Sequence, residues 1–352
     1  MPETAVRPVL LTSPPTADDA LPGEAARSAR GLDPADVEAV LRWAAGLGPR
    51  VPHPASGGTA RRWELLASVG AQDLSVARML EPHLDALAIL AEDGTTPPAD
   101  STWGVWAAEG PNARLTAQGS DEAGWVLDGR KPWCSLAGSL THGLVTAWVG
   151  DHQRRLFAVE MADPGVTVED GRWVPAGLAE VVTTPVAMTA VAARPVGTTG
   201  WYLERDGFWW GGIGVAAVWY GGAVGLARRL ARQVREREPD QLALMHLGEV
   251  DAALAGARAT LAEAAAVVDA GGVTGPGAVL LGARVRHVVA TAVELVGRHV
   301  AHAVGPGPLS QEPEHVARVA DLALYVRQHH AERDAAGLGG MLAEHHPEEA
   351  PW

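Results

Sequence analysis

The stretch KPWCS (residues 131–135) follows a hairpin signal, WVLDGR (125–130), in which Asp128-Gly129 supplies the turn. Side chains two residues apart on a strand point to the same side, so Trp133 and Ser135 are expected to share one face of a sheet. An indole and a hydroxyl on one face can give a planar cofactor a wall and one hydrogen bond. A hairpin with a single buried tryptophan is the alternative, and these residues alone leave both interpretations open.

The composition is that of an acidic chain with a large core. Its 352 residues are enough for two or three domains, and 47% of them are hydrophobic. The formal net charge of −14 argues against nucleic acid or an anionic membrane as the main partner, since both select basic surfaces. A local basic groove for an anionic ligand is still compatible with this charge.

The chain has a single cysteine, Cys134, which excludes an intramolecular disulfide and fits a reducing cytosol. The first residues, MPETAVRPVLLTSPPTADDALPGE, have no basic segment followed by an apolar run. We therefore expect no signal peptide, no transmembrane span and a cytoplasmic location.

The hydrophobic period changes twice along the chain. Residues 1–32 are rich in Pro, Ala and Asp and predict a flexible arm. Helical spacing over 33–100, beginning with an N-cap at Asp33-Pro34, predicts a helical domain. Short runs broken by Gly, Pro and Asn over 101–206 predict a β domain of about seven strands, either a small barrel or a sandwich.

Helical spacing returns over 207–338 and predicts four long amphipathic helices in an antiparallel bundle. Gly221, Gly222 and Gly225 lie inside the first of these helices, where glycine is unfavourable, so we expect them to permit close packing. Residues 339–352 are expected to form a tail. The predicted fold class is therefore α+β and multidomain, with a helical region, a β domain and a four-helix bundle in that order.

That order is also the architecture of acyl-CoA dehydrogenases, and several stretches of the chain resemble segments of this superfamily. The stretch DGRKPWCS (128–135) is similar to the strand that contacts the flavin in that family. The resemblance covers about residues 35–338. Four further stretches carry it: 73–83, 173–197, 221–227 and 318–321.

The resemblance implies FAD as the cofactor and a homodimer or homotetramer that shares the cofactor site. It places Trp133 beside the flavin ring and Ser135 against the N5 edge of that ring. Cys134 lies between them in the predicted cofactor segment, although its side chain is expected on the opposite face of the strand. The remaining predicted cofactor contacts are Glu109, which belongs to the loop before this strand, and Trp173.

Two departures from the family pattern concern the cofactor and the base. The family's Arg-Phe-Gly motif, which helps hold the flavin pyrophosphate across a subunit interface, corresponds to the shortened stretch REREPD (235–240). Losing such a bidentate contact would weaken flavin binding. The commonest branch of the family has a glutamate eight residues after the aspartate that matches Asp321, and this position is His329, followed by His330.

His329 and His330 are the predicted catalytic residues, because a neutral histidine titrates near the working pH. Their context, RQHHAER (327–333), is closer to flavin-dependent monooxygenases with the same fold. His329 is expected on one helical face with Asp321 and Tyr325. Cationic histidines at a helix end are the alternative interpretation.

Other groups have structural interpretations. Asp321, Arg318 and Glu314 are interpreted as a surface ion-pair ladder. The aromatic segment 201–210 can line a flat pocket or form the core of a domain junction, and we favour the junction core. No metal site is expected, because no second Glu-x-x-His pair is present.

The leading hypothesis is a flavoprotein that oxidises the Cα–Cβ bond of an acyl thioester while a base removes the α-proton. Glu249 and Glu263 are conceivable substitute bases, although no spacing selects them. The two histidines motivate a second hypothesis, a reduced-flavin-dependent monooxygenase on the same fold. A degenerate relative that binds a ligand or partner without redox chemistry is the third, motivated by the missing Arg-Phe-Gly motif and glutamate.

Overall fold

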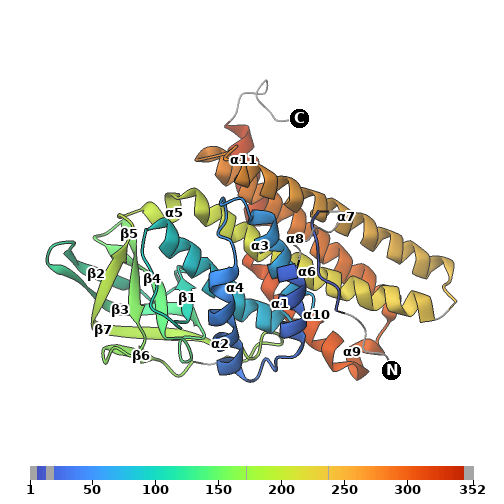
Figure 1. Cartoon of the computed structure of the whole chain (residues 1–352), viewed down its shortest axis with the longest axis horizontal. Helices are drawn as coiled ribbons and strands as arrows, with labels where there is room; N and C mark the ends of the chain where they lie inside the picture. The colour runs from blue at the N-terminus through green and yellow to red at the C-terminus, as the bar shows by residue number, and fades with distance from the viewer. Residues whose placement is uncertain (1–5, 13–19, 172, 237, 345–352) are drawn as a thin grey trace.

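The computed structural model describes residues 6–12, 20–171, 173–236 and 238–344, which form a mixed structure of helices and a seven-stranded sheet (Figure 1). This confirms the predicted mixture of helices and sheet, while the predicted domain boundaries stay predictions. The helices before the sheet are α1 (Ala20–Arg30), α2 (Val37–Leu47), the 3-10 helix η2 (Gly48–Arg50), α3 (Thr59–Gly70) and α4 (Leu74–Glu92). The strands are β1 (Trp103–Trp106), β2 (Leu115–Ser120), β3 (Gly124–Ser135), β4 (His142–Val149), β5 (Gln153–Glu160), β6 (Val166–Val168) and β7 (Thr183–Val196). The helices after the sheet are α5 (Trp201–Glu204), α6 (Asp206–Glu236), α7 (Gln241–Asp269), α8 (Pro276–Val304), α9 (Pro308–Gln311), α10 (Pro313–Tyr325), the 3-10 helix η3 (Val326–Gln328) and α11 (Glu332–Ala343).

Part of the predicted flexible arm is a packed helix. Residues 20–30 form α1, which buries a face of small side chains and packs against α3. The predicted cap at Asp33-Pro34 is one turn too early, because the cap of α2 is Asp36, whose side chain accepts a hydrogen bond from the N–H of Ala39. At the other end α11 reaches Ala343, inside the expected tail, and residues 345–352 lie outside the described part of the chain.

The strand pairings close a ring. β4 pairs with β2, β2 with β3, β3 with β7, β7 with β5, and β5 with β4. β1 adds to β4 in parallel, and β6 adds to β7. Apolar side chains such as Leu127, Phe157 and Val191 are completely buried in this region. The closed ring favours the barrel over the sandwich, and closure leaves few unpaired strand edges.

The predicted turn at Asp128-Gly129 is wrong. β3 runs without a break from Gly124 to Ser135 along β7, and the pairing register shifts between Leu127 and Gly129. Gly129 has a φ of +120°, and a Cβ there would lie 2.2 Å from the carbonyl oxygen of Arg114. The partners of Leu127 and Gly129 in β7, Val191 and Met188, are three residues apart, so the extra residue of this bulge lies in β7 opposite Asp128. Gly129 supplies a positive φ inside the strand, the same conformational freedom that a hairpin turn needs.

Helix α6 is the central long helix and packs against α3, α7, α8 and α10. The expectation that its glycines permit close packing is confirmed, since a Cβ on Gly221 would lie 2.1 Å from the carbonyl oxygen of Ala67 in α3. By length and composition alone α6 could cross a membrane, but 72% of its most apolar window is buried inside the protein. Such burial is typical of a core helix of a folded domain.

Helix α4 lies between the strands and the long helices (Figure 1). It contacts β1 on one side and α6 and α10 on the other. The side chain of Asp73 caps its first turn by accepting a hydrogen bond from the N–H of Val76. Side chains of α4 therefore meet both the sheet and the helices at this junction.

Candidate active site

A cavity of about 840 Å³ opens at the junction of α4, the strands and the long helices. We call it the junction cavity. It lies in the volume range of small-molecule and cofactor sites. Among the residues that line it are Glu81 of α4, Trp133 and Ser135 of β3, Trp209 of α6, Tyr325 of α10 and His330.

Trp133 and Ser135 both line this cavity. Trp133 is 57% exposed and has a φ of +58°. A positive φ on a bulky residue is rare and strained, and such residues cluster at functional sites. The pairing of β3 with β7 shifts between Lys131 and Cys134, so a bulge directs the indole out of the regular strand. The Ser135 hydroxyl lies 2.9 Å from the Thr183 hydroxyl, which also lines the cavity.

Cys134 lies in the protein core and not in the cavity. Its side chain is completely buried, and its Sγ lies 3.4 Å from the carbonyl oxygen of Lys131. Burial raises the pKa of the Cys134 thiol to about 12. The structure thus corrects its inclusion among the predicted cofactor contacts: the side chain packs as a small apolar group.

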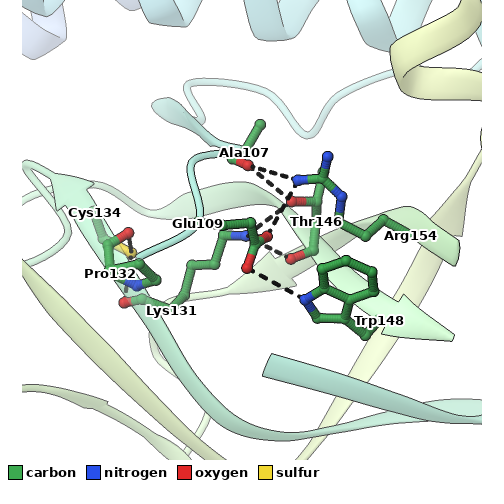
Figure 2. Close-up of polar contacts among 8 residues, drawn as sticks. All are labelled: Ala107, Glu109, Lys131, Pro132, Cys134, Thr146, Trp148 and Arg154. Carbon is green, nitrogen blue, oxygen red and sulfur yellow. Dashed lines mark hydrogen bonds and ion pairs between the residues drawn. The ribbon is translucent and has the colours of Figure 1, made fainter. Parts of the chain in front are cut away.

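Glu109 lines the cavity, but its carboxylate binds Lys131, the only lysine of the chain (Figure 2). The Lys131 ammonium is 1% exposed and donates to Glu109 Oε1 at 2.6 Å. It also donates to the carbonyl oxygen and the hydroxyl of Thr146, at 2.9 and 2.8 Å. Burial lowers the pKa of Lys131, and the bond to Glu109 acts in the opposite direction. All three donors of the ammonium are therefore satisfied inside the protein.

The same carboxylate accepts hydrogen bonds from Trp148 Nε1 and Arg154 Nη1, each at 3.3 Å (Figure 2). Glu109 therefore ties the segment after β1 to β3, β4 and β5. Its predicted role as a cofactor contact stays a prediction, and the structural role was not foreseen. The available signal was a lone lysine in a chain that otherwise uses arginine.

Trp173 also lines the cavity. Its indole Nε1 is buried and has no hydrogen-bond partner among the described residues. An unsatisfied buried N–H is costly in a folded protein and is one sign of a missing partner. The indole N–H can donate to an acceptor atom of a bound ligand.

His329 is 4% exposed and does not line the cavity. α10 ends at Tyr325, so His329 lies beyond the helix. The expectation that His329 shares a helical face with Asp321 is therefore wrong. Its Nδ1 accepts a hydrogen bond from the N–H of Ala331, and its Nε2 lies 3.9 Å from Asp334 Oδ2. Burial lowers the pKa of His329, which favours the neutral ring.

His330 is the histidine of this pair that lines the cavity. Its side chain is largely exposed, and its Nδ1 lies 3.3 Å from Asp334 Oδ1. The structure therefore separates the two predicted catalytic residues. His330 can meet a ligand at the edge of the cavity, whereas the His329 ring is enclosed by protein.

Glu81 is a carboxylate in the cavity that the sequence analysis did not single out. It is 7% exposed, and its Oε2 accepts a hydrogen bond from the Tyr325 hydroxyl at 3.3 Å. Arg78 Nη1 lies 3.6 Å from the same oxygen. Burial raises the pKa of Glu81 to about 7, against the smaller opposing effect of Arg78. A usable signal was present, because Glu81 shares a helical face with the apolar residues Ala77 and Leu84.

The aromatic segment after the sheet divides between pocket and core. Tyr202, Phe208 and Trp209 line the cavity, whereas Trp210 is buried in the core. Both interpretations of this segment therefore hold for part of it. The substitute bases considered from the sequence, Glu249 and Glu263, are exposed on α7 and do not line the cavity.

Asp321 does not belong to a surface ladder. It is 8% exposed, and it accepts hydrogen bonds from the N–H of Leu178 at 2.6 Å and from the Ser75 hydroxyl at 3.2 Å. Arg318 donates instead to the carbonyl oxygens of Ala71 and Gln72. The predicted surface ladder is wrong because both side chains point into the protein, where they bind backbone groups of distant segments.

No family model and no curated protein matches the sequence, but solved structures match the fold. Butyryl-CoA dehydrogenase from Megasphaera elsdenii is 16% identical, with a TM-score of 0.80 over 95% of this chain and 100% of that chain. KijD3, solved with FMN and a dTDP-linked amino keto sugar, is 20% identical, with a TM-score of 0.77 over 95% of each chain. Dibenzothiophene monooxygenase (TdsC) from Paenibacillus sp. A11-2 is 17% identical, with a TM-score of 0.75 over 96% of this chain and 99% of that chain. The chain therefore has the acyl-CoA dehydrogenase fold, as the sequence resemblance implied.

Proposed function

We propose that this protein is a flavin-dependent oxidoreductase that holds its flavin and a small organic substrate in the junction cavity. The observation that carries the proposal is that Trp133, Ser135 and Trp173 line the same cavity as the Glu81 carboxylate. Aromatic walls with a few convergent polar groups and a perturbed carboxyl are typical of an active site. The neighbours of the fold support this function, since KijD3 and TdsC have been solved with FMN.

The residues present fit a flavin. The exposed Trp133 indole offers a flat apolar surface, and the unpartnered Trp173 N–H offers a donor for a ring oxygen or nitrogen. The Ser135 and Thr183 hydroxyls would bind a polar edge. A bound flavin would supply hydride acceptance or, when reduced, oxygen activation. FAD is the form that the sequence resemblance implies, and FMN is the form bound in KijD3 and TdsC.

Oxidation of an acyl thioester is the first specific reaction that we propose. It requires a carboxylate or another base near the substrate, and Glu81 is such a group within the cavity. The role of the chain would be to orient the thioester, exclude water and accept the α-proton. The fold of butyryl-CoA dehydrogenase is in line with this reaction.

Flavin-dependent monooxygenation is the second specific reaction that we propose, and one observation favours it. His330 lines the cavity close to the position where the resemblance places a glutamate, and TdsC is named as a monooxygenase. A histidine at the cavity edge can donate or accept a proton near neutral pH. For either reaction we propose a homodimer or homotetramer.

Flavin binding is the first test. The purified protein is titrated with FAD and with FMN, and binding is followed by the visible spectrum and by quenching of flavin fluorescence. We expect Trp133→Ala to weaken binding about tenfold, or about 1.4 kcal/mol, through loss of the ring contact. Trp43→Ala, on α2 and outside the cavity, is the matched control and should bind as the wild type does.

A wild-type protein that binds neither flavin would contradict the proposed function and favour the non-redox relative. If flavin binds, the two reactions are separated by adding butyryl-CoA without oxygen. Bleaching of the oxidised flavin supports the dehydrogenase. Oxygenation of a small aromatic probe such as indole, seen only when reduced flavin and oxygen are both supplied, supports the monooxygenase.

A further inference from the structure

We propose that Glu81 is the proton acceptor for the substrate in the junction cavity, with Tyr325 as the hydrogen-bond partner that holds its carboxylate. The inference rests on the proposed function in one respect, because it takes the junction cavity as the substrate site. It moves the base from the histidines after α10 to the N-terminal helix α4. Glu81 would be a catalytic residue, and Tyr325 a positioning residue.

The position of Glu81 in the fold supports this role. Helix α4 contacts both β1 and the long helices, so a side chain on its cavity face lies opposite β3 and next to α10. Arg78, one turn earlier on α4, lies 3.6 Å from Glu81 Oε2 and 3.5 Å from the Ser135 hydroxyl. One guanidinium thus bridges the proposed base and the proposed flavin wall.

The two oxygens of Glu81 have different surroundings. Oε2 accepts the hydrogen bond from Tyr325 and faces Arg78. Within the described residues, no hydrogen bond or ion pair involves Oε1. Because Glu81 lines the cavity, Oε1 is the atom available to a ligand. One oxygen is therefore held in place while the other is free to react.

The surroundings of Glu81 keep the acid and the carboxylate forms of its side chain at similar populations near neutral pH. Removal from water favours the neutral acid, and this is the largest effect on its pKa, which lies at about 7. Arg78 and Arg62 favour the carboxylate, whereas the neighbouring Asp85 opposes it. A base poised near the working pH transfers protons efficiently. Several charged or titratable groups interact electrostatically with Glu81. They are Arg78 and Asp85 of α4, Arg62 of α3, Tyr202 of α5, Arg286 of α8 and Tyr325 of α10.

The step itself is a single proton transfer. The bond between a substrate atom and its acidic hydrogen breaks, and its electron pair stays on the substrate. The proton moves to Glu81 Oε1, which forms an O–H bond, so the carboxylate becomes a neutral carboxylic acid. Tyr325 keeps its own proton, since its pKa lies well above the usual value because of burial.

The predicted histidines fit this role less well. The His329 ring does not line the cavity, and the His330 ring lies at its exposed edge beside Asp334. Neither shares contacts with the Ser135 side of the cavity, whereas Arg78 connects Glu81 to Ser135.

The first experiment needs neither flavin nor substrate. The apoprotein is labelled with ¹³C at glutamate side-chain carboxyls, and the Glu81 resonance is identified by its loss in Glu81→Gln. We expect this resonance to titrate near pH 7 and to move to higher pH in Tyr325→Phe, because the hydroxyl stabilises the carboxylate. Titration at the ordinary glutamate value would overturn the proposal.

The second experiment uses the flavin-loaded protein with the substrate class identified by the tests of function. E81Q should lose turnover by about 100-fold or more while flavin affinity stays unchanged. Glu81→Asp should recover part of the rate. Y325F should shift the rising limb of the pH profile of turnover upward, in parallel with the resonance. Glu263→Gln, on the exposed face of α7, is the matched control and should leave both the rate and the pH limb unchanged.

E81Q with wild-type turnover and an unchanged pH limb would overturn the role of Glu81 and leave the flavin function standing. A protein that binds no flavin would contradict the proposed function instead. In that case the titration of the apoprotein still decides whether Glu81 is poised for proton transfer.

Discussion

At the residue scale the molecule buries two titratable side chains, Lys131 of β3 and Glu81 of α4, whose hydrogen-bond partners differ in number. Lys131 is the clearest case, because its ammonium is buried and all its donors reach Glu109 or Thr146. A buried charge is tolerated only when it is paired and fully hydrogen-bonded. Glu81 is the contrasting case, since one of its oxygens is held and the other faces the cavity. The satisfied lysine stabilises the scaffold, and the partly free carboxylate is suited to chemistry.

Replacing Lys131 tests the first of these roles. Lys131→Met should reduce the free energy of unfolding by about 3 kcal/mol, because the carboxylate of Glu109 and the carbonyl of Thr146 lose their buried cation. Urea denaturation followed by circular dichroism measures the loss. The double variant Lys131→Met/Glu109→Gln should be less destabilised than the single one, since Glu109 is then no longer a carboxylate that lacks its lysine, and Arg154 keeps its hydrogen bond to the carbonyl oxygen of Ala107. A single variant within about 0.5 kcal/mol of the wild type would contradict this role.

At the element scale the close approach of α3 and α6 sets the position of the central helix. Gly221 of α6 lies against the backbone of Ala67 in α3, so the space between the two helices at this point is too small for even a methyl group. Because α6 also packs on α4 and α8 and lines the junction cavity, a shift of this helix would change the cavity. Interiors are close-packed and transmit such shifts.

Gly221→Ala is therefore expected to destabilise the protein by about 1–3 kcal/mol, even though alanine is the better helix former. The added methyl carbon would lie 2.1 Å from a carbonyl oxygen that cannot move alone. The control is Gly256→Ala on α7, where a Cβ meets nothing within 4 Å. This variant should be stabilised by up to about 1 kcal/mol. Thermal unfolding of both variants measures the effect, and equal shifts in the two would refute the packing argument.

At the scale of the whole molecule, three parts of the chain are joined by Asp321. Its carboxylate reaches from α10 to the N–H of Leu178 before β7 and to the hydroxyl of Ser75 on α4. A Cβ on the neighbouring Gly177 would lie 2.2 Å from the backbone of Ala320, so the loop before β7 sits directly on α10. These contacts hold the segments that border the junction cavity.

Asp321→Ala should lower the free energy of unfolding by about 2–4 kcal/mol, because a buried N–H and a buried hydroxyl lose their acceptor. Asp321→Asn keeps one acceptor oxygen and should lose less. Asp251→Ala, an exposed aspartate on α7, should stay within about 0.5 kcal/mol of the wild type. Guanidinium denaturation gives the three values. An Asp321→Ala variant as stable as the Asp251 control would show that the three-way contact contributes nothing.

Local patterns account for the parts that sequence reasoning predicted correctly. The alternation in KPWCS predicted that Trp133 and Ser135 share a side, and both line the junction cavity, although a bulge between Lys131 and Cys134 interrupts the alternation there. The same reasoning misplaced Asp128-Gly129, because a glycine with a positive φ suits a position inside a strand as well as a turn, and only the pairing with β7 distinguishes the two. Arg318 and Asp321 were misplaced because helical spacing shows which residues are neighbours on a helix, but not which protein surface covers that face.

By itself, the sequence determined the change from helices to strands and back, and the close packing of α6 through its glycines. These follow from periodicities and backbone preferences that act over a few residues. Only the tertiary structure decided that Glu81, Ser135 and Tyr325 line one cavity and that His329 is enclosed outside it. Such contacts join residues far apart in the chain, and their energies depend on burial and on partners that no local pattern contains.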